Sequence, residues 1–157
     1  MPYAISDSIR LYGTNEPVEP PRILQAGPLT VEFEAGNLRY IRYRGHEMIR
    51  AVSFVVRDKN WGTYAPRMTN LDFHEEPDSF RISYEAVVGG DKQAFRYSAI
   101  ITGESNGSLN FSAGGTTASD FLTNRTGFVV LHPIEGVAGV ACTVEHVDGA
   151  IDQFADN

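Results

Sequence analysis

Apolar and polar residues alternate with a period of two through the middle of this chain, and this pattern predicts β-strands. The clearest run is Ser79 to Val88, in which the apolar residues share one face and the polar residues share the other. The same period returns from Phe95 to Thr102, after a turn signal at Gly89 to Lys92. The pair Asn106-Gly107 predicts a type I′ hairpin turn. With the alternating residues from Leu109 to Ala113, these segments predict an antiparallel meander.

Shorter alternating runs predict more strands on both sides of the meander. Thr30 to Glu34 and Leu38 to Tyr43 flank the turn signal Ala35-Gly36-Asn37, so they predict a hairpin. Further strands are predicted at Met48 to Ile49, Ser53 to Arg57, Gly127 to His132 and Val140 to Glu145. No segment has the apolar spacing of an amphipathic helix of three turns. The sequence therefore predicts an all-β fold, an antiparallel β-sandwich, with a barrel as the alternative.

The two ends of the chain differ from its strand-rich middle. Prolines recur between Pro17 and Pro28 and exclude a long helix, so residues 1–28 are predicted to be an irregular lead-in. The β-sandwich domain is predicted to span residues 29–149. Within it, His74-Glu75-Glu76 is followed by Pro77 and is predicted to be a loop. Residues 150–157 are predicted to be a linker.

Composition limits the partners and the compartment. The formal net charge is -7, whereas nucleic acid and anionic membranes both favour a basic face. No segment approaches the roughly 18 to 20 consecutive apolar residues of a membrane span, and no signal peptide is visible. The single cysteine, Cys142, excludes an internal disulfide and is predicted to be a small buried side chain. We therefore expect a cytoplasmic protein with no nucleic-acid or membrane partner.

Signals for cofactors and metals are missing from the sequence. There is no Walker-type phosphate loop, no dinucleotide-binding glycine fingerprint and no GxSxG nucleophile elbow. The four histidines are scattered, and none has zinc-ligand spacing to another His or Cys. We therefore expect no cofactor and no metal.

The segment Phe121 to Pro133 sets a polar cluster directly before the apolar run Phe128 to Leu131. Four large apolar residues in a row predict a buried strand. Asn124, Arg125 and His132 would then stand at the ends of a rigid element, where binding groups are useful. The alternative is a core strand whose polar ends are only solvated.

A second cluster surrounds the only tryptophan, in the stretch Arg57 to Tyr64. Asn60 and Trp61 combine an amide with an aromatic face, a mixture that suits sugar-like ligands. The alternative is a loop in which Trp61 packs as an anchor at the edge of the core.

The third candidate is the pair Glu145-His146. A carboxylate beside an imidazole can serve acid–base catalysis, which makes this pair the catalytic candidate of the chain. Adjacent residues of a strand point to opposite faces, however, so the two side chains need not act together.

Four stretches of the sequence resemble the N-terminal domain of the D-apionate lactonase family, which contains bacterial sugar-acid lactonases. They are GPLTVEFEAGNLRYIRYRGHEMIR, VVRDKNWGTYAP, DFLTNRTGFVVLHP and ACTVEHVDG, and NWGTYAP and FLTNRTGFVVLHP are the most specific parts. The resemblance runs from about Leu11 to Gly149. It implies a β-rich N-terminal domain followed in the family by a TIM barrel and a small C-terminal β domain.

This resemblance implies that the chain is a domain excised from a longer lactonase, which hydrolyses D-apionolactone to D-apionate. The partner would be the missing TIM-barrel domain of the same polypeptide, and residues 150–157 would lead toward it. The chemistry of TIM-barrel enzymes sits at the C-terminal face of the barrel, so this domain alone is expected to be inactive. Asn60, Trp61, Asn124, Arg125 and His132 would face the barrel or a small sugar acid or lactone.

The opening hairpin also resembles galactose-mutarotase-like sandwiches, through the step Gly45-His46-Glu47-Met48. That resemblance implies a partial supersandwich. It leaves a second hypothesis, in which a stand-alone carbohydrate-binding or mutarotase-like domain uses Trp61, Arg125, His132 or Glu145. The catalytic His and Glu of mutarotases have no residue-by-residue match here.

Overall fold

A computed structural model describes residues 7–15, 19–90 and 93–155 of the chain. In the described residues, one short helix, α1 (Asp7–Tyr12), precedes a series of strands. The strands are β1 (Arg22–Ala26), β2 (Leu29–Glu34), β3 (Asn37–Tyr43), β4 (His46–Asp58), β5 (Arg67–Glu76), β6 (Ser79–Gly90), β7 (Gln93–Gly103), β8 (Leu109–Thr117), β9 (Thr123–Leu131), β10 (Cys142–Glu145) and β11 (Ile151–Phe154). None of the described helices is long and apolar enough to cross a membrane.

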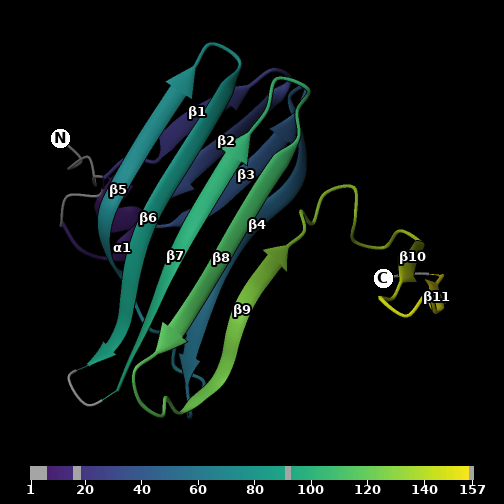
Figure 1. The fold of residues 1–157 in the computed structure, drawn as a ribbon. Helices are drawn as coiled ribbons and strands as arrows, with labels where there is room; N and C mark the ends of the chain where they lie inside the picture. Colours follow the sequence, from purple (N-terminus) through teal and green to yellow (C-terminus); the bar gives the residue numbers. More distant parts are fainter. Residues whose placement is uncertain (1–6, 16–18, 91–92, 156–157) are drawn as a thin grey trace, which may run out of the picture.

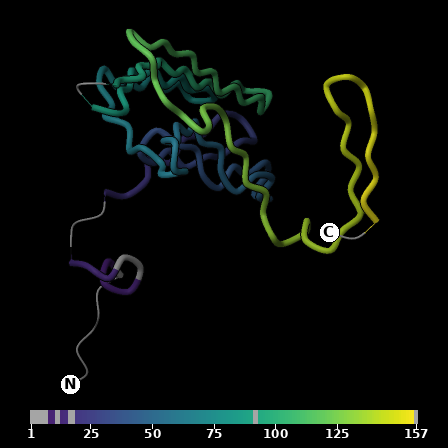
Figure 2. Tube along the Cα trace, turned by 90° about the horizontal axis from the view of Figure 1, so that it is seen from below, coloured from purple at the N-terminus to yellow at the C-terminus, as the bar shows by residue number. Residues whose placement is uncertain are grey.

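Two antiparallel sheets face each other and form a β-sandwich (Figure 1). One sheet has the strand order β1-β2-β3-β4-β9, and the other has the order β5-β6-β7-β8. Figure 2 shows the sheets as two layers, with the small β10–β11 hairpin standing apart from both. The predicted all-β antiparallel sandwich is confirmed, while its galactose-mutarotase-like assignment stays a prediction.

The core lies between the layers and follows from the alternation in the sequence. Along β6, every second side chain from Phe80 to Val88 is buried, because the period of a strand places these residues on one face. The facing sheet contributes Leu24, Val31 and Leu38, each almost completely buried. Apolar surface removed from water on both inner faces is the main stabilising contribution of such a sandwich.

Two tyrosines bring hydroxyl groups into this core. Tyr84 Oη donates a hydrogen bond of 2.9 Å to the carbonyl of Gly36, in the turn between β2 and β3. Burial raises the pKa of Tyr84, and the nearby Tyr97 raises it further. Burial also raises the pKa of Tyr97. Both side chains are therefore held in the neutral form well above physiological pH.

The hairpin turns differ in detail from their sequence signals. Ala35 and Gly36 both have positive φ, 46° and 81°, as a type I′ turn requires. The type I′ prediction for Asn106-Gly107 was wrong, because only Gly107 has positive φ (85°). Its N–H donates to the carbonyl of Glu104, which makes a type I turn followed by a left-handed glycine. That longer turn arises because the backbone pairing of Glu104 with Ser108 leaves three residues in the loop.

Three segments that were expected to lack strands contain them. β1 lies inside the predicted irregular lead-in, where Leu24 and Ala26 alternate into the core and the whole strand pairs with β2. β5 includes His74-Glu75-Glu76, which was wrongly predicted to be a loop. Its alternation is obscured by a register shift between Thr69 and Asp72. β11 lies in the predicted linker, and it pairs with β10.

Two burial predictions were wrong. Phe128, Val130 and Leu131 form part of strand β9 but are 44%, 46% and 51% exposed. The physical reason is that β9 is an edge strand, paired in the described residues only with β4. Cys142 is only half-buried, because it belongs to the separate β10–β11 hairpin.

The two open sides of the sandwich are not equivalent. On the side of β1 and β5, Arg22 Nε donates to Glu75 Oε1 at 2.9 Å, and its guanidinium lies 4.0 Å from the centre of the Phe73 ring. Phe73 in turn meets Phe33 edge to face. On the side of β8 and β9, apolar side chains border an open groove.

Candidate functional site

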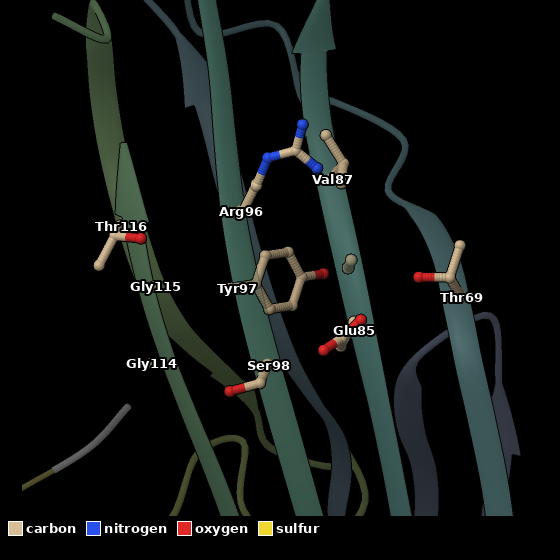
Figure 3. Close-up of a pocket in the computed structure, with 10 residues that line it drawn as sticks. Thr69, Glu85, Val87, Arg96, Tyr97, Ser98, Gly114, Gly115 and Thr116 are labelled. Carbon is tan, nitrogen blue, oxygen red and sulfur yellow. The ribbon is translucent and has the colours of Figure 1, made fainter. Parts of the chain in front are cut away.

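A shallow hollow of about 420 Å³ lies on the outer face of the β5–β8 sheet (Figure 3). Antiparallel register aligns Thr69, Glu85, Ser98 and Gly114 side by side across its four strands. Figure 3 shows these residues along neighbouring strands, with Thr116 on the far edge. Neighbouring side chains on one face of a sheet lie within contact distance, so the row forms a continuous polar floor.

Charged groups lie on one side of the hollow, and bare backbone lies on the other. Asn70 Nδ2 donates to Glu85 Oε2 at 2.8 Å, which orients the carboxylate. Arg96 forms no ion pair with the described residues, and its guanidinium extends toward Val87. A cation, an oriented acceptor and open backbone suit the binding of a hydroxylated anion better than they suit bond cleavage.

Sequence reasoning did not single out this hollow. The signal that could have revealed it is Gly114-Gly115 inside a strand, since glycine there often marks the close approach of a ligand or another backbone. A side chain at Gly114 would meet nothing within 4 Å. The outward positions of Glu85 and Arg96 also follow from the period of their strands.

The Trp61 cluster forms a tight loop after β4, organised by one carboxylate. Asp58 Oδ1 accepts hydrogen bonds from the backbone N–H groups of Asn60 at 2.7 Å and Gly62 at 2.9 Å. The backbone N–H of Asp58 donates to the carbonyl of Gly62 at 2.8 Å. These bonds explain why a segment with three charged residues and a glycine adopts one defined turn.

Trp61 stands at the outer end of this loop with an unusual backbone. Its φ is 70°, in the left-handed region that costs a non-glycine residue roughly 1 to 2 kcal/mol. Its side chain is 55% exposed, so the ring is not buried in the core. A large exposed aromatic residue in a strained position is typical of functional sites.

Two arginines from paired strands hold the tryptophan. Arg57 Nη1 donates to the Trp61 carbonyl at 2.9 Å, and the guanidinium of Arg125 lies 5.9 Å from the ring centre. Arg57 and Arg125 are opposite each other in the β4–β9 ladder. In the described part of the chain Arg125 forms no ion pair with Asp120, its nearest acidic residue in the sequence. The loop therefore presents an aromatic face beside a cation.

The remaining binding candidates divide between the two ends of β9. Asn60 borders a hollow of about 240 Å³ next to the Trp61 loop. Asn124 is exposed at the register shift that precedes Arg125. His132 is exposed just beyond the other end of the strand. His132 follows Arg125 by seven steps of extended chain, roughly 23 Å, so the structure does not place them in one site.

The catalytic candidates Glu145 and His146 belong to the separate hairpin. Glu145 is opposite Ile151 in the β10–β11 ladder. His146 Nε2 lies 2.9 Å from Asp152 Oδ2, so its carboxylate partner is Asp152 rather than Glu145. All three residues are exposed. Among the residues that the structure describes, no three His, Cys, Asp or Glu side chains come together as a metal site would require.

Comparison with known proteins assigns this sandwich to a family. The family described as "D-apionate lactonase, N-terminal domain" matches residues 9–155, which is nearly the whole chain and includes the hairpin. The chain belongs to the D-apionate lactonase N-terminal domain family.

The chain is also similar to a curated protein, the D-apionate lactonase of Brucella anthropi. It is 45% identical to the chain over 148 residues, which are 94% of the chain. The chain spans only 24% of that relative's length. No solved structure matches the chain.

Proposed function

We propose that this sandwich is the non-catalytic N-terminal module of a bacterial sugar-acid lactonase that hydrolyses D-apionolactone to D-apionate. The observation that carries the proposal is the 45% identity to a D-apionate lactonase of which the chain covers 24%. The reaction would take place in the cytoplasm, in a further domain of the same polypeptide, which the family resemblance suggests is a TIM barrel.

The positions of the ionisable side chains favour a non-catalytic role for this domain. Arg125 and His132 stand at opposite ends of β9, and His146 pairs with Asp152 on an exposed hairpin. General acid–base catalysis needs such groups within hydrogen-bond reach of one substrate. Trp61 and Arg125 suit a protein contact instead, because exposed tryptophan and arginine are the residue types most enriched at the centres of interfaces.

Acid release from D-apionolactone tests the proposal. The full-length protein is expected to acidify the assay, and the 157-residue chain at the same concentration is expected not to. Turnover by the short chain comparable to that of the full-length protein would overturn the non-catalytic role. A full-length protein that leaves D-apionolactone intact would overturn the substrate.

A further inference from the structure

The open side of the sandwich contains an apolar groove of about 440 Å³ between the edge strands β8 and β9. Buried side chains of the core, including Leu38 and Ile41, form its floor. Its rim is formed by Tyr43, Met48, Phe128 and Val130, all of them more than one-third exposed. A groove this apolar does not suit a sugar acid, which needs several polar partners.

In the described residues, the edge strands that border the groove each lack a second strand partner. In the described residues, β9 pairs only with β4, and β8 pairs only with β7. Phe111 of β8 and Phe128 of β9 meet across the groove, with ring centres 5.0 Å apart. On the opposite side of the sandwich, Arg22 connects β1 to β5 through its contacts with Glu75 and Phe73. Exposed edges with apolar side chains are the usual template for an added strand.

Exposed apolar residues continue from the groove toward the C-terminus. Leu131 and Ile134 are followed by a series that includes Val137, Val140, Val144, Ile151 and Phe154. Isolated exposed apolar residues are ordinary, but so many in one stretch of the sequence favour contact with further polypeptide. The relative from Brucella anthropi has about three-quarters of its length beyond the matched part, so the same polypeptide can supply the contact.

We propose that an extended segment of the remaining polypeptide adds to the free edge of β9 and places its alternate apolar side chains in the groove. The inference rests on the proposed function only in requiring that the chain be part of a longer protein. It commits to a strand because β9 offers a row of backbone donors and acceptors, and because side chains of a strand alternate into such a groove.

The experiment uses the full-length protein with a protease site introduced after Asn157, cleaved after folding. Val130→Asp puts a charge into the groove, and Ile23→Asp is the control. Ile23 is an exposed apolar residue, at 69% exposure, on β1, the other edge strand of the same sheet. We expect Val130→Asp to weaken the association of the sandwich with the rest of the cleaved protein about tenfold or more. It should also expose the β9 amides to hydrogen exchange. Ile23→Asp should have neither effect.

Equal behaviour of the two variants would overturn the inference. Protection of the β9 amides after the sandwich is separated would also overturn it, because the chain's own hairpin would then cover the groove. A dimer of separated sandwiches would overturn it as well. If the Val130→Asp variant does not fold, the isosteric Val130→Thr variant is tested instead, by the same association and hydrogen-exchange measurements. Lactonase activity of the full-length protein is measured in parallel. Normal activity together with β9 amides that exchange freely in the unmutated protein would refute only the added strand. A lack of activity in the unmutated protein would refute only the proposed function.

Discussion

Arg125 lies over the indole ring of Trp61, with its guanidinium carbon 5.9 Å from the ring centre, and joins the end of β9 to the loop after β4. The contact is on the surface, and the ring is more than half exposed. A cation–π pair at an exposed site stabilises a protein by only about 0.5 to 1 kcal/mol. The pair is therefore better suited to recognition than to holding the sandwich together.

Trp61→Ala and Arg125→Ala should each change the free energy of unfolding of the isolated chain by no more than about 1 kcal/mol. Chemical denaturation measures this, and Leu24→Ala, in the core, is the comparison that should lose about 2 to 5 kcal/mol. In the full-length protein, the same two surface variants should loosen domain docking or lower lactonase activity. A loss of 3 kcal/mol or more for Trp61→Ala alone, with docking intact, would contradict the interface role.

The left-handed backbone of Trp61 gives a separate prediction. Glycine adopts positive φ without the steric cost that a Cβ atom brings, so Trp61→Gly should be about 1 kcal/mol more stable than Trp61→Ala. Both variants lose the same ring and the same contact with Arg125, so their difference isolates the backbone. Denaturation midpoints of the two variants decide the matter. Equal midpoints would mean that the loop relaxes to negative φ once the indole is removed.

The sequence predicted the inner strands well because their burial repeats with a strict period. Phe80 to Val88 and the residues opposite them on β7 alternate without interruption. The same reasoning missed β5, where Asn70 adopts a φ of 53° inside a register shift and changes which face later residues occupy. It also gave β9 too much burial. Apolar composition cannot distinguish a central strand from an edge strand that awaits a partner, because both are rich in large apolar residues.

The candidate site shows the same division. Local composition drew attention to Asn60, Trp61 and Arg125, and register across β4 and β9 does bring Trp61 and Arg125 together. The hollow around Glu85 and Arg96 depends on the alignment of β5, β6, β7 and β8. That alignment is a property of tertiary pairing, and the local signal Gly114-Gly115 does not reveal which residues lie beside it.

Two glycines in the same sheet should respond very differently to an added methyl group. A Cβ at Gly103 would lie 2.3 Å from Cε1 of Phe80, inside the core, whereas a Cβ at Gly114 would meet nothing within 4 Å. Gly103→Ala should therefore destabilise the chain by roughly 1 to 3 kcal/mol through overpacking. Gly114→Ala should stay within about 0.5 kcal/mol of the unmutated chain. Thermal or denaturant unfolding of the pair provides the measurement, and similar losses in both would show that the Phe80 ring moves aside.

The buried hydroxyl of Tyr84 couples the stability of the sandwich to alkaline pH. Burial raises the pKa of Tyr84 in the folded protein above the value near 10 that tyrosine has when unfolded. A raised pKa of this kind leaves stability intact below about pH 10 and removes it as the pH rises further, because only the unfolded chain releases the proton readily. For each such tyrosine, the free energy of unfolding falls by up to about 1.4 kcal/mol per pH unit above about pH 10.

Tyr84→Phe removes both the proton and the hydrogen bond to Gly36. At pH 8 the variant should be about 1 kcal/mol less stable than the unmutated chain. Its stability should then fall less steeply above pH 10, so that the two curves meet near about pH 11. Ile82→Val is the matched control, since Ile82 is a buried neighbour on the same strand and its replacement typically costs about 0.5 to 1.5 kcal/mol without removing an ionisable group. Its curve should stay parallel to that of the unmutated chain from pH 8 to about 11.5, whereas a parallel curve for Tyr84→Phe would show that Tyr84 ionisation is not linked to unfolding.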